Sequence, residues 1–363
     1  MILNDSSNSS PLLPYFTKNL PGIGGIFRAS SEDFCVEEIP AYQPCGQGEH
    51  LYLWIEKKGL STDAVLAHLA KKSGISQHSL GYAGKKDTQA QTRQWVSLHI
   101  PSDPDLTTFE MPGLRVLHAT RHLNKLRLGH LTGNRFQITL REVIHPERLN
   151  AIVSQIRAQG FPNFFGDQRL GHGHSNVHAG REIVSGERSI KGNLNRVRFS
   201  TNALQSALFN RVVSLRLGLQ HDVTTLLPGD LAVLHHNGAH FSVLAESLST
   251  EQQRVLQGET SASAPMFGYK VPLASGVPGE LESTVLAEQH LTLEDFRLGG
   301  KRVSPKGERR AIRALAHELV WKHPHPQDAT QIVLEFRLDR GVYATTLLRE
   351  VMKNDSLRDV FAP

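Results

Sequence analysis

The sequence predicts an α+β protein built on a mixed, largely antiparallel sheet. Its predicted strands alternate apolar and polar residues, which is the pattern of strands that bury one face. Helices with a single apolar stripe stand between such strands, whereas the strands of a doubly wound parallel sheet read as continuous apolar runs. The length of 363 residues corresponds to about two domains, each able to bury a core.

The first elements are two strands and a helix. Residues 24–58 predict two strands around a loop, because residues 26–39 lead to a proline and apolar residues alternate over 51–55. A helix is predicted from Ser61, whose hydroxyl can accept hydrogen bonds from the free amides of the first turn. An apolar stripe follows, and Gly74 ends the helix.

Later segments repeat the pattern of alternating strand and striped helix. Strands are predicted over 96–100 and 136–140, and a helix over 149–160, where a glycine ends it. Near the carboxyl end, residues 332–338 predict a strand and residues 343–352 a helix. These last two elements resemble the first domain again.

The segment between these regions, residues 222–300, has a different pattern of apolar and turn-forming residues. It has short apolar runs and Pro-Gly turns, and we expect it to belong to a second domain inserted into the first. No apolar run approaches the ~20 residues that span a bilayer, and the polar start lacks the layout of a signal peptide. Cys35 and Cys45 cannot form a disulfide framework. We therefore expect a cytoplasmic protein.

Basic residues are distributed unevenly along the chain. The total is 40 Lys and Arg against 35 Asp and Glu, but residues 114–141 and 188–221 contain no acid and residues 297–313 contain only one. Such segments suit a polyanion, because each cation near a phosphate releases condensed counterions. The alternative is that the fold brings acidic residues to these segments. With three such segments, nucleic acid is the favoured partner.

The segment GYAGKKDTQAQT, residues 81–92, is the most informative in the chain. Its glycines and alanine let the backbone approach a ligand closely, and its one carboxylate, Asp87, follows two lysines. Cations beside a carboxylate lower its pKa, so Asp87 could act as a nucleophile or base. The alternative is an ordinary Asx-turn. No GxxxxGK[ST] loop occurs, so a nucleoside triphosphate site is not supported.

Residues 128–136 enter a strand through a glycine turn. Asn134 and Phe136 lie two residues apart and therefore on one face of an extended chain. An amide can read a base edge and a ring can stack on a base. The alternative places Phe136 in the core and Asn134 in the turn.

A histidine-rich run offers a metal site as a further hypothesis. His172, His174 and His178 have imidazoles that could bind zinc, but they lie in a loop without an HExxH helix or paired cysteines. A metal is therefore disfavoured. No GxSxG elbow supports a hydrolase triad.

Four motifs together resemble the TruD family of tRNA pseudouridine synthases over nearly the whole chain. SEDFCVEE (31–38) resembles P-E-D-F-x-V-x-E, and AGKKD (83–87) resembles A-G-x-K-D. KLRLG with GNRF, within 125–136, resembles K-L-R-x-G with G-N-x-F. PNFFGDQRLG (162–171) resembles P-N-Y-F-G-x-Q-R-F-G, with Phe164 and Leu170 as departures.

The resemblance implies the pseudouridine synthase fold, formed by residues 1–160 and 306–363 and interrupted by an α/β TRUD insertion domain, residues 161–305. It implies isomerisation of uridine to pseudouridine, most often at position 13 of a tRNA such as tRNA(Glu). In the family the Asp of A-G-x-K-D is catalytic, which gives that role to Asp87. The residues that it assigns to substrate binding are Arg28, Phe34, Lys86, Asn134 and Phe136. The family often has Lys at the position of Arg28.

The resemblance also bears on cofactors and partners. The base leaves C1′, rotates and reattaches through C5, so we expect neither a metal nor another cofactor. Asp87 could attack C1′, attack C6 or abstract a sugar proton. The expected partner is tRNA, with no membrane, no required protein and a monomeric chain. Two alternatives are a catalytically inactive RNA-binding or tRNA-folding protein, and a metal-dependent nucleic-acid hydrolase built on His172, His174 and His178.

Overall fold

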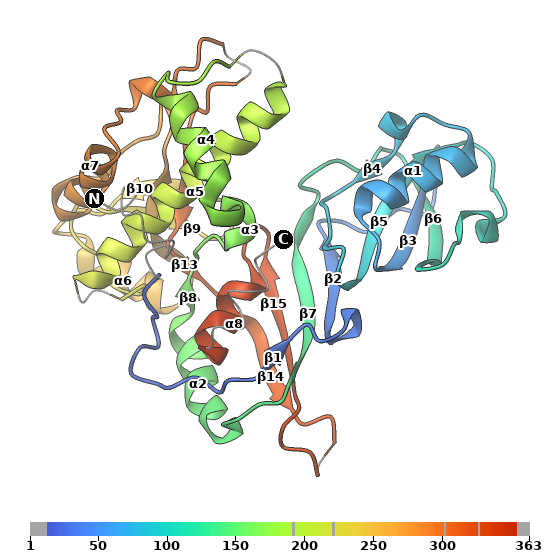
Figure 1. Ribbon diagram of the computed structural model, residues 1–363, viewed down its shortest axis with the longest axis horizontal. Coiled ribbons are helices and arrows are strands. Elements are labelled where there is room, and N and C mark those ends of the chain that lie inside the picture. The colour runs from blue at the N-terminus through green and yellow to red at the C-terminus, as the bar shows by residue number, and fades with distance from the viewer. Residues whose placement is uncertain (1–12, 191–192, 220–221, 301–302, 326, 354–363) are drawn as a thin grey trace. The chain divides into compact units, whose positions relative to one another are not determined.

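The computed structural model describes residues 13–190, 193–219, 222–300, 303–325 and 327–353, which form two compact units (Figure 1). The first, called here the sheet unit, consists of Ile23–Glu147 and Ala316–Ala344. The second unit holds the other described residues, which fall within 13–22, 148–315 and 345–353. The predicted insertion, residues 161–305, lies inside the second unit, and its limits stay a prediction.

The sheet unit is built on one nine-stranded sheet. Its strands are β1 (Ile26–Phe27), β2 (Phe34–Pro40), β3 (His50–Lys58), β4 (Gly81–Tyr82), β5 (Gln91–His99), β6 (Leu114–His122), β7 (Leu131–Arg141), β14 (His317–Lys322) and β15 (Ile332–Asp339). The main path runs β14-β15-β7-β2-β5-β3-β6, with β1 beside β7 and β4 beside β5. Only the pair β2–β5 is parallel among the described pairings. The predicted α+β class with a mixed, largely antiparallel sheet is confirmed.

One predicted strand is divided in the structure. Residues 26–39 form β1 and β2 with a 3-10 turn, Ser31–Asp33, between them. Arg28 has a φ of 59°, a left-handed conformation that no regular strand accepts. The Ser30 side chain and the Asp33 carboxylate then close a capping box over the turn. The prediction of one continuous strand was therefore wrong.

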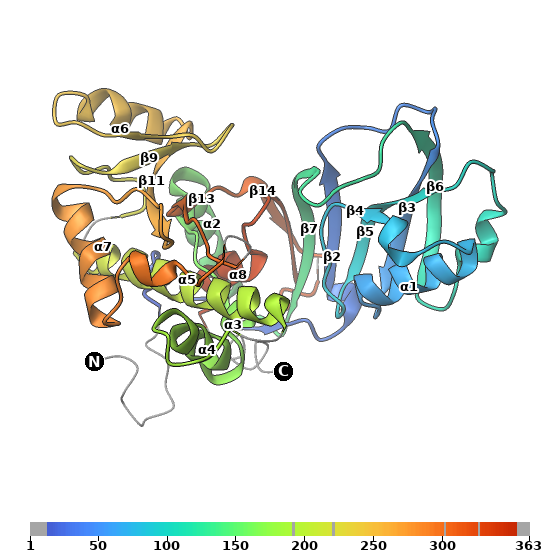
Figure 2. The same ribbon diagram turned by 90° about the horizontal axis from the view of Figure 1, so that it is seen from above.

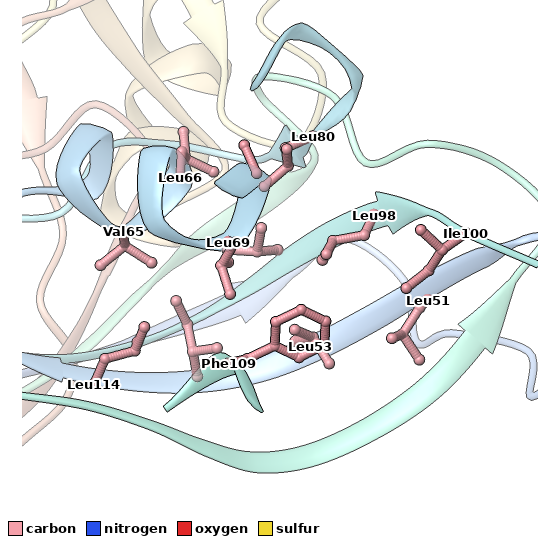
Figure 3. Close-up of a cluster of buried hydrophobic side chains, with 13 residues drawn as sticks. Leu51, Leu53, Val65, Leu66, Leu69, Leu80, Leu98, Ile100, Phe109 and Leu114 are labelled. Carbon is pink, nitrogen blue, oxygen red and sulfur yellow. The ribbon is translucent and has the colours of Figure 1, made fainter. Parts of the chain in front are cut away.

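The core of the sheet unit lies under helix α1 (Thr62–Ser73), which Figure 2 shows along the strands β3 and β5. The Ser61 hydroxyl accepts a hydrogen bond from the Ala64 amide, and Gly74 ends the helix at a φ of 69°, as predicted. Figure 3 shows α1 side chains such as Leu69 packed against strand residues such as Leu53. Both are fully buried, which contributes roughly 1.5–3 kcal/mol for each side chain.

The second unit combines helices with a smaller sheet. Its helices are α2 (Leu149–Gln159), α3 (Asp167–Leu170), α4 (Ser175–Val184), α5 (Leu194–Gly218), α6 (Leu248–Leu256), α7 (Gly276–Glu288) and α8 (Ala344–Met352). Its strands are β8 (Phe161–Pro162), β9 (Leu231–Leu234), β10 (His240–Ser242), β11 (Thr260–Met266), β12 (Glu308–Ala311) and β13 (Arg313–Ala314). The order β10-β9-β11-β12 forms one sheet, and β8 pairs with β13. Within the described ranges, no helix is both long and apolar enough to cross a membrane.

Candidate active site

Asp87 lies in the segment between β4 and β5, with its carboxylate held at both oxygens. The Arg28 guanidinium donates to Oδ2 at 2.6 Å, and the Gln89 amide donates to Oδ1 at 3.0 Å. The bond from the Gln89 amide is that of an Asx-turn, the alternative considered for this segment. The Asx-turn therefore accounts for Oδ1 of the carboxylate. The other oxygen faces a cation. The Asp87 side chain keeps 23% of its surface exposed, so the carboxylate is accessible.

Arg28 reaches Asp87 from the turn between β1 and β2. Its guanidinium lies 5.0 Å from the ring centroid of Phe27 and 4.2 Å from that of Phe34. These cation–π contacts leave the side chain 9% exposed. Arg28 has a left-handed φ, and with this backbone conformation its side chain extends toward Asp87. Strand periodicity gives no indication of this geometry.

The two lysines beside Asp87 in the sequence bond to other carboxylates. The Lys85 ammonium donates to Asp63 at 2.7 Å, and the Lys86 ammonium donates to Glu38 at 2.7 Å. The expectation that these two lysines supply the cations at the Asp87 carboxylate was therefore wrong. Neighbouring side chains of a non-helical segment point in different directions, and the cation that bonds the carboxylate comes from Arg28 instead.

Lys86 and Glu38 form a buried ion pair, with side chains 5% and 1% exposed. Glu38 also accepts a hydrogen bond from the Trp95 amide at 3.3 Å. Burial raises the pKa of Glu38, and the adjacent Lys86 lowers it in part. Lys86 is thus directed to Glu38 in this structure. Lys86 was expected at the site from the sequence, whereas its partner Glu38 was not.

Phe136 and Asn134 lie on one face of β7, as predicted. In the register of the sheet, Phe136 stands between Val36 of β2 and Phe336 of β15. The rings of Phe34 and Phe136 are 6.0 Å apart, and Phe136 stacks on Phe336 at 5.2 Å. Phe336 was missed by sequence reasoning. Its alternation in β15 marks it as a buried strand residue, but only the pairing places it against Phe136.

Asn134 occupies the next position on the same face, between Glu38 of β2 and Leu338 of β15. Its Oδ1 atom is buried and accepts no hydrogen bond from any described residue. A buried amide oxygen without a donor is costly, by roughly 1–3 kcal/mol. It is therefore a candidate acceptor for a ligand N–H.

Three polar side chains hold the main chain of the Asp87 segment. The Lys57 ammonium donates to the Asp87 carbonyl at 2.6 Å, and the Gln94 amide donates to the Gly84 carbonyl at 3.3 Å. The Lys86 amide donates to the Thr62 hydroxyl at 3.0 Å. Sequence reasoning missed all three residues. A signal was present for Lys57, since it continues the buried face of alternate residues from Leu51 to Ile55.

A pocket of about 280 Å³ opens beside the Arg28–Asp87 pair. It is lined by Arg28, Ala29, Ser30, Ser31, Gly59, Thr88 and Gln89. Small-ligand sites commonly occupy about 300–1,000 Å³, so this pocket is slightly smaller than that range. Its lining includes the two residues that follow Asp87.

Comparison with known proteins gives a consistent result. The family described as tRNA pseudouridine synthase D (TruD) matches residues 13–190 and 188–351. The chain belongs to this family. A tRNA pseudouridine synthase D from Thermus thermophilus is 42% identical over 95% of this chain and 93% of the relative. One from Syntrophotalea carbinolica is 36% identical over 94% of this chain and 99% of the relative.

A solved structure is similar over the same extent. The crystal structure of a Methanosarcina mazei protein described as tRNA pseudouridine synthase D matches with a TM-score of 0.77 and 26% identity. The match covers 95% of this chain and 97% of the other. The structural match agrees with the fold class expected from the sequence. The family is one of tRNA-modifying enzymes, which agrees with the expected tRNA partner.

Some arginines of the basic segments are buried in ion pairs and are not exposed for contact with RNA phosphates. Arg216 pairs with Asp230 and Arg309 with Glu282, and all four side chains are nearly fully buried. These cations are enclosed in the second unit and cannot face a phosphate in this structure. Other residues remain exposed, including Arg127 in the loop before β7. Lys191, Lys301 and Arg302 lie outside the described residues.

The histidine-rich run forms a short turn and the start of α4. His172 and His174 are in the 3-10 turn, and His178 is in α4. The side chain of His172 is outside the described part of the chain. Among the side chains that the structure describes, no three His, Cys, Asp or Glu residues are grouped so that they could hold a metal ion.

Proposed function

We propose that this chain converts uridine 13 of tRNA(Glu) to pseudouridine, with Asp87 as the catalytic carboxylate. The observation that carries the proposal is the ion pair of Asp87 with Arg28, beside a sheet face that bears Asn134 and Phe136. The chain acts as a cytoplasmic monomer and needs no other protein. Its catalytic domain has the pseudouridine synthase fold, interrupted by the TRUD insertion at residues 161–305.

The proposed chemistry uses one carboxylate beside the target nucleotide. The N1–C1′ bond breaks, the base turns, and a C5–C1′ bond forms. C5 loses its proton and N1 gains one, so no water is consumed and there is no net oxidation or reduction. Asp87 serves any of three routes: attack at C1′, attack at C6, or removal of a sugar proton. Arg28 holds Oδ2 at 2.6 Å and so fixes the direction of the carboxylate.

Asn134 and the aromatic side chains bind the base. The free Oδ1 of Asn134 accepts the N3–H of uracil, a donor that cytosine lacks. Phe136 stacks on the base and Phe34 forms a second wall of the site, which offsets the few kcal/mol that base flipping costs. Stacking contributes roughly 1–3 kcal/mol for each ring. Lys86 acts through Glu38, which it holds next to Asn134 in the sheet.

Pseudouridine mapping on an unmodified tRNA(Glu) transcript tests this proposal. We expect the wild-type protein to form pseudouridine at position 13, also with EDTA present. Asp87→Asn should abolish turnover and leave tRNA binding nearly intact, because it removes the reactive carboxylate and keeps the shape. The matched control is Asp63→Asn, an exposed aspartate paired with Lys85, which should stay active.

Two results would contradict the proposal. Product formed by Asp87→Asn would remove this residue from the chemistry. A wild-type protein that binds the transcript but forms no pseudouridine at any position would favour the alternative of an RNA-binding protein without catalysis. A transcript with cytidine at position 13 serves as the RNA control.

A further inference from the structure

Lys57 is a fully buried lysine in a strand whose other inward residues are apolar. It follows Leu51, Leu53 and Ile55 on the buried face of β3, and its relative exposure is 0%. Lysine is rarely buried completely, because desolvation of the ammonium is costly. An apolar side chain at this position would avoid that cost. The lysine therefore needs a reason beyond packing.

The ammonium of Lys57 joins two main-chain segments. It donates to the Leu60 carbonyl at 2.7 Å and to the Asp87 carbonyl at 2.6 Å. Leu60 directly precedes Ser61, the residue that caps α1. The same helix carries Thr62, whose hydroxyl accepts from the Lys86 amide. The start of α1 and the Asp87 segment are thus linked by hydrogen bonds, and Lys57 supplies the charged donor.

Lys57 also has an unusual electrostatic environment. The pKa of Lys57 is lowered to about 8, chiefly by burial; the nearby Asp87 raises this pKa in part, and the nearby Lys86 lowers it. Lys57 thus interacts with the Asp87 charge as well as with its main chain. Arg28 bonds the carboxylate, and Lys57 bonds the carbonyl of the same residue.

We propose that Lys57 is a positioning residue of the isomerisation: its buried ammonium fixes the Asp87 main chain and adds a second positive charge beside this residue. The inference rests on the proposed function, since Lys57 can position a catalytic group only if Asp87 takes part in the reaction. Catalytic groups must keep their geometry within about 0.5 Å, and a main chain held by one short hydrogen bond meets that need directly.

The first test replaces Lys57 by methionine, which has a similar length and no charge. The matched control is Lys58→Met, which removes the same charge from the next residue. Lys58 is half-exposed and pairs with Glu32. In single-turnover reactions with saturating enzyme, we expect Lys57→Met to lower the rate about 10²-fold. The dissociation constant for tRNA should match that of Lys58→Met.

The second test is the pH profile of the single-turnover rate. The ammonium is charged below its pKa, so the wild-type rate should fall as the pH rises through about 8. Asp87 and Lys86 are the charged groups that act on it. Lys57→Met should lack this decline, whereas Lys58→Met should keep it. A merely structural lysine would not change the profile in this way.

A third measurement does not depend on activity. NMR titration of the lysine side chains should show Lys57 with a pKa below 10.5, and Asp87→Asn should lower it further because the favourable charge is lost. A wild-type protein without synthase activity but with this coupling would refute the proposed function and leave the Lys57–Asp87 interaction standing. An active wild type with no coupling would refute the inference alone.

Two further outcomes overturn the positioning role. One is a Lys57→Met protein with the wild-type rate. The other is a rate loss that follows the unfolded fraction, measured by near-UV circular dichroism, and disappears at a lower temperature. In that case Lys57 would serve stability only. Lys57→Arg adds a check, because it keeps the charge, and partial recovery of the rate is expected.

Discussion

At the residue scale, Asp87 uses its two carboxylate oxygens differently. One oxygen closes a local turn through the Gln89 amide, and the other bonds the guanidinium of Arg28. The turn could arise from local sequence alone, since Asp favours it. The ion pair depends on two residues 59 positions apart. The site thus combines a common local motif with a contact that only the fold provides.

Substitution of Arg28 tests that contact. Arg28→Met should lower kcat/KM about 10²-fold, because the carboxylate loses its only charged hydrogen-bond donor among the described side chains. Arg28→Lys should retain more activity, since it keeps the charge but not the planar guanidinium. Steady-state kinetics on the tRNA transcript measure both. Arg93→Met, an exposed arginine paired with Glu37 and Glu56, is the control. Equal activity of Arg28→Met and the control would contradict the role.

At the element scale, α1 connects the core to the site. Its inner face packs on β3 and β5, and its first turn supplies Thr62 to the Asp87 segment. Loosening the helix should therefore affect both stability and chemistry. Helix α1 therefore belongs to both the core and the site, as do β3 and β5.

Leu69→Ala should lower the free energy of unfolding by about 2–5 kcal/mol, because it leaves a cavity under α1. Urea denaturation followed by circular dichroism measures the change. Leu123→Ala is the control, since that side chain is 60% exposed and its loss should cost less than about 0.5 kcal/mol. A Leu69→Ala protein as stable as the control would show that the helix contributes little to the core.

At the scale of the whole molecule, we expect charge to govern tRNA binding. Two arginines of the basic segments, Arg216 and Arg309, are buried in ion pairs, so the count of basic residues overstates the cations available to phosphates. Arg127 is an exposed one, in a loop tied to the Asp87 segment by the bond from the Gly129 amide to the Ala83 carbonyl. Binding should be salt-dependent, but less steeply than the sequence suggests.

Fluorescence anisotropy with labelled tRNA at a series of KCl concentrations measures that dependence. The logarithm of the binding constant should fall linearly with the logarithm of the salt concentration, with a slope of about −0.7 to −0.9 for each phosphate contact. Arg127→Gln should make the slope less steep by about one contact. Arg93→Gln should leave it unchanged. A slope near zero for the wild type would contradict an electrostatic mode of binding.

The sequence by itself determined the fold class, most elements and the family. Alternation predicted the strands, the Ser61 cap and Gly74 predicted both ends of α1, and four motifs indicated the family and Asp87. These features are local, because they depend on residues a few positions apart.

Only the tertiary structure decided which groups face Asp87. In the fold, Arg28 bonds the carboxylate, and the adjacent Lys85 and Lys86 do not. The fold also places Lys57 at the Asp87 carbonyl and Phe336 against Phe136. It also divided the predicted strand at Arg28. Strand register and a single left-handed residue set these contacts, and both are fixed by the packing of segments distant in sequence.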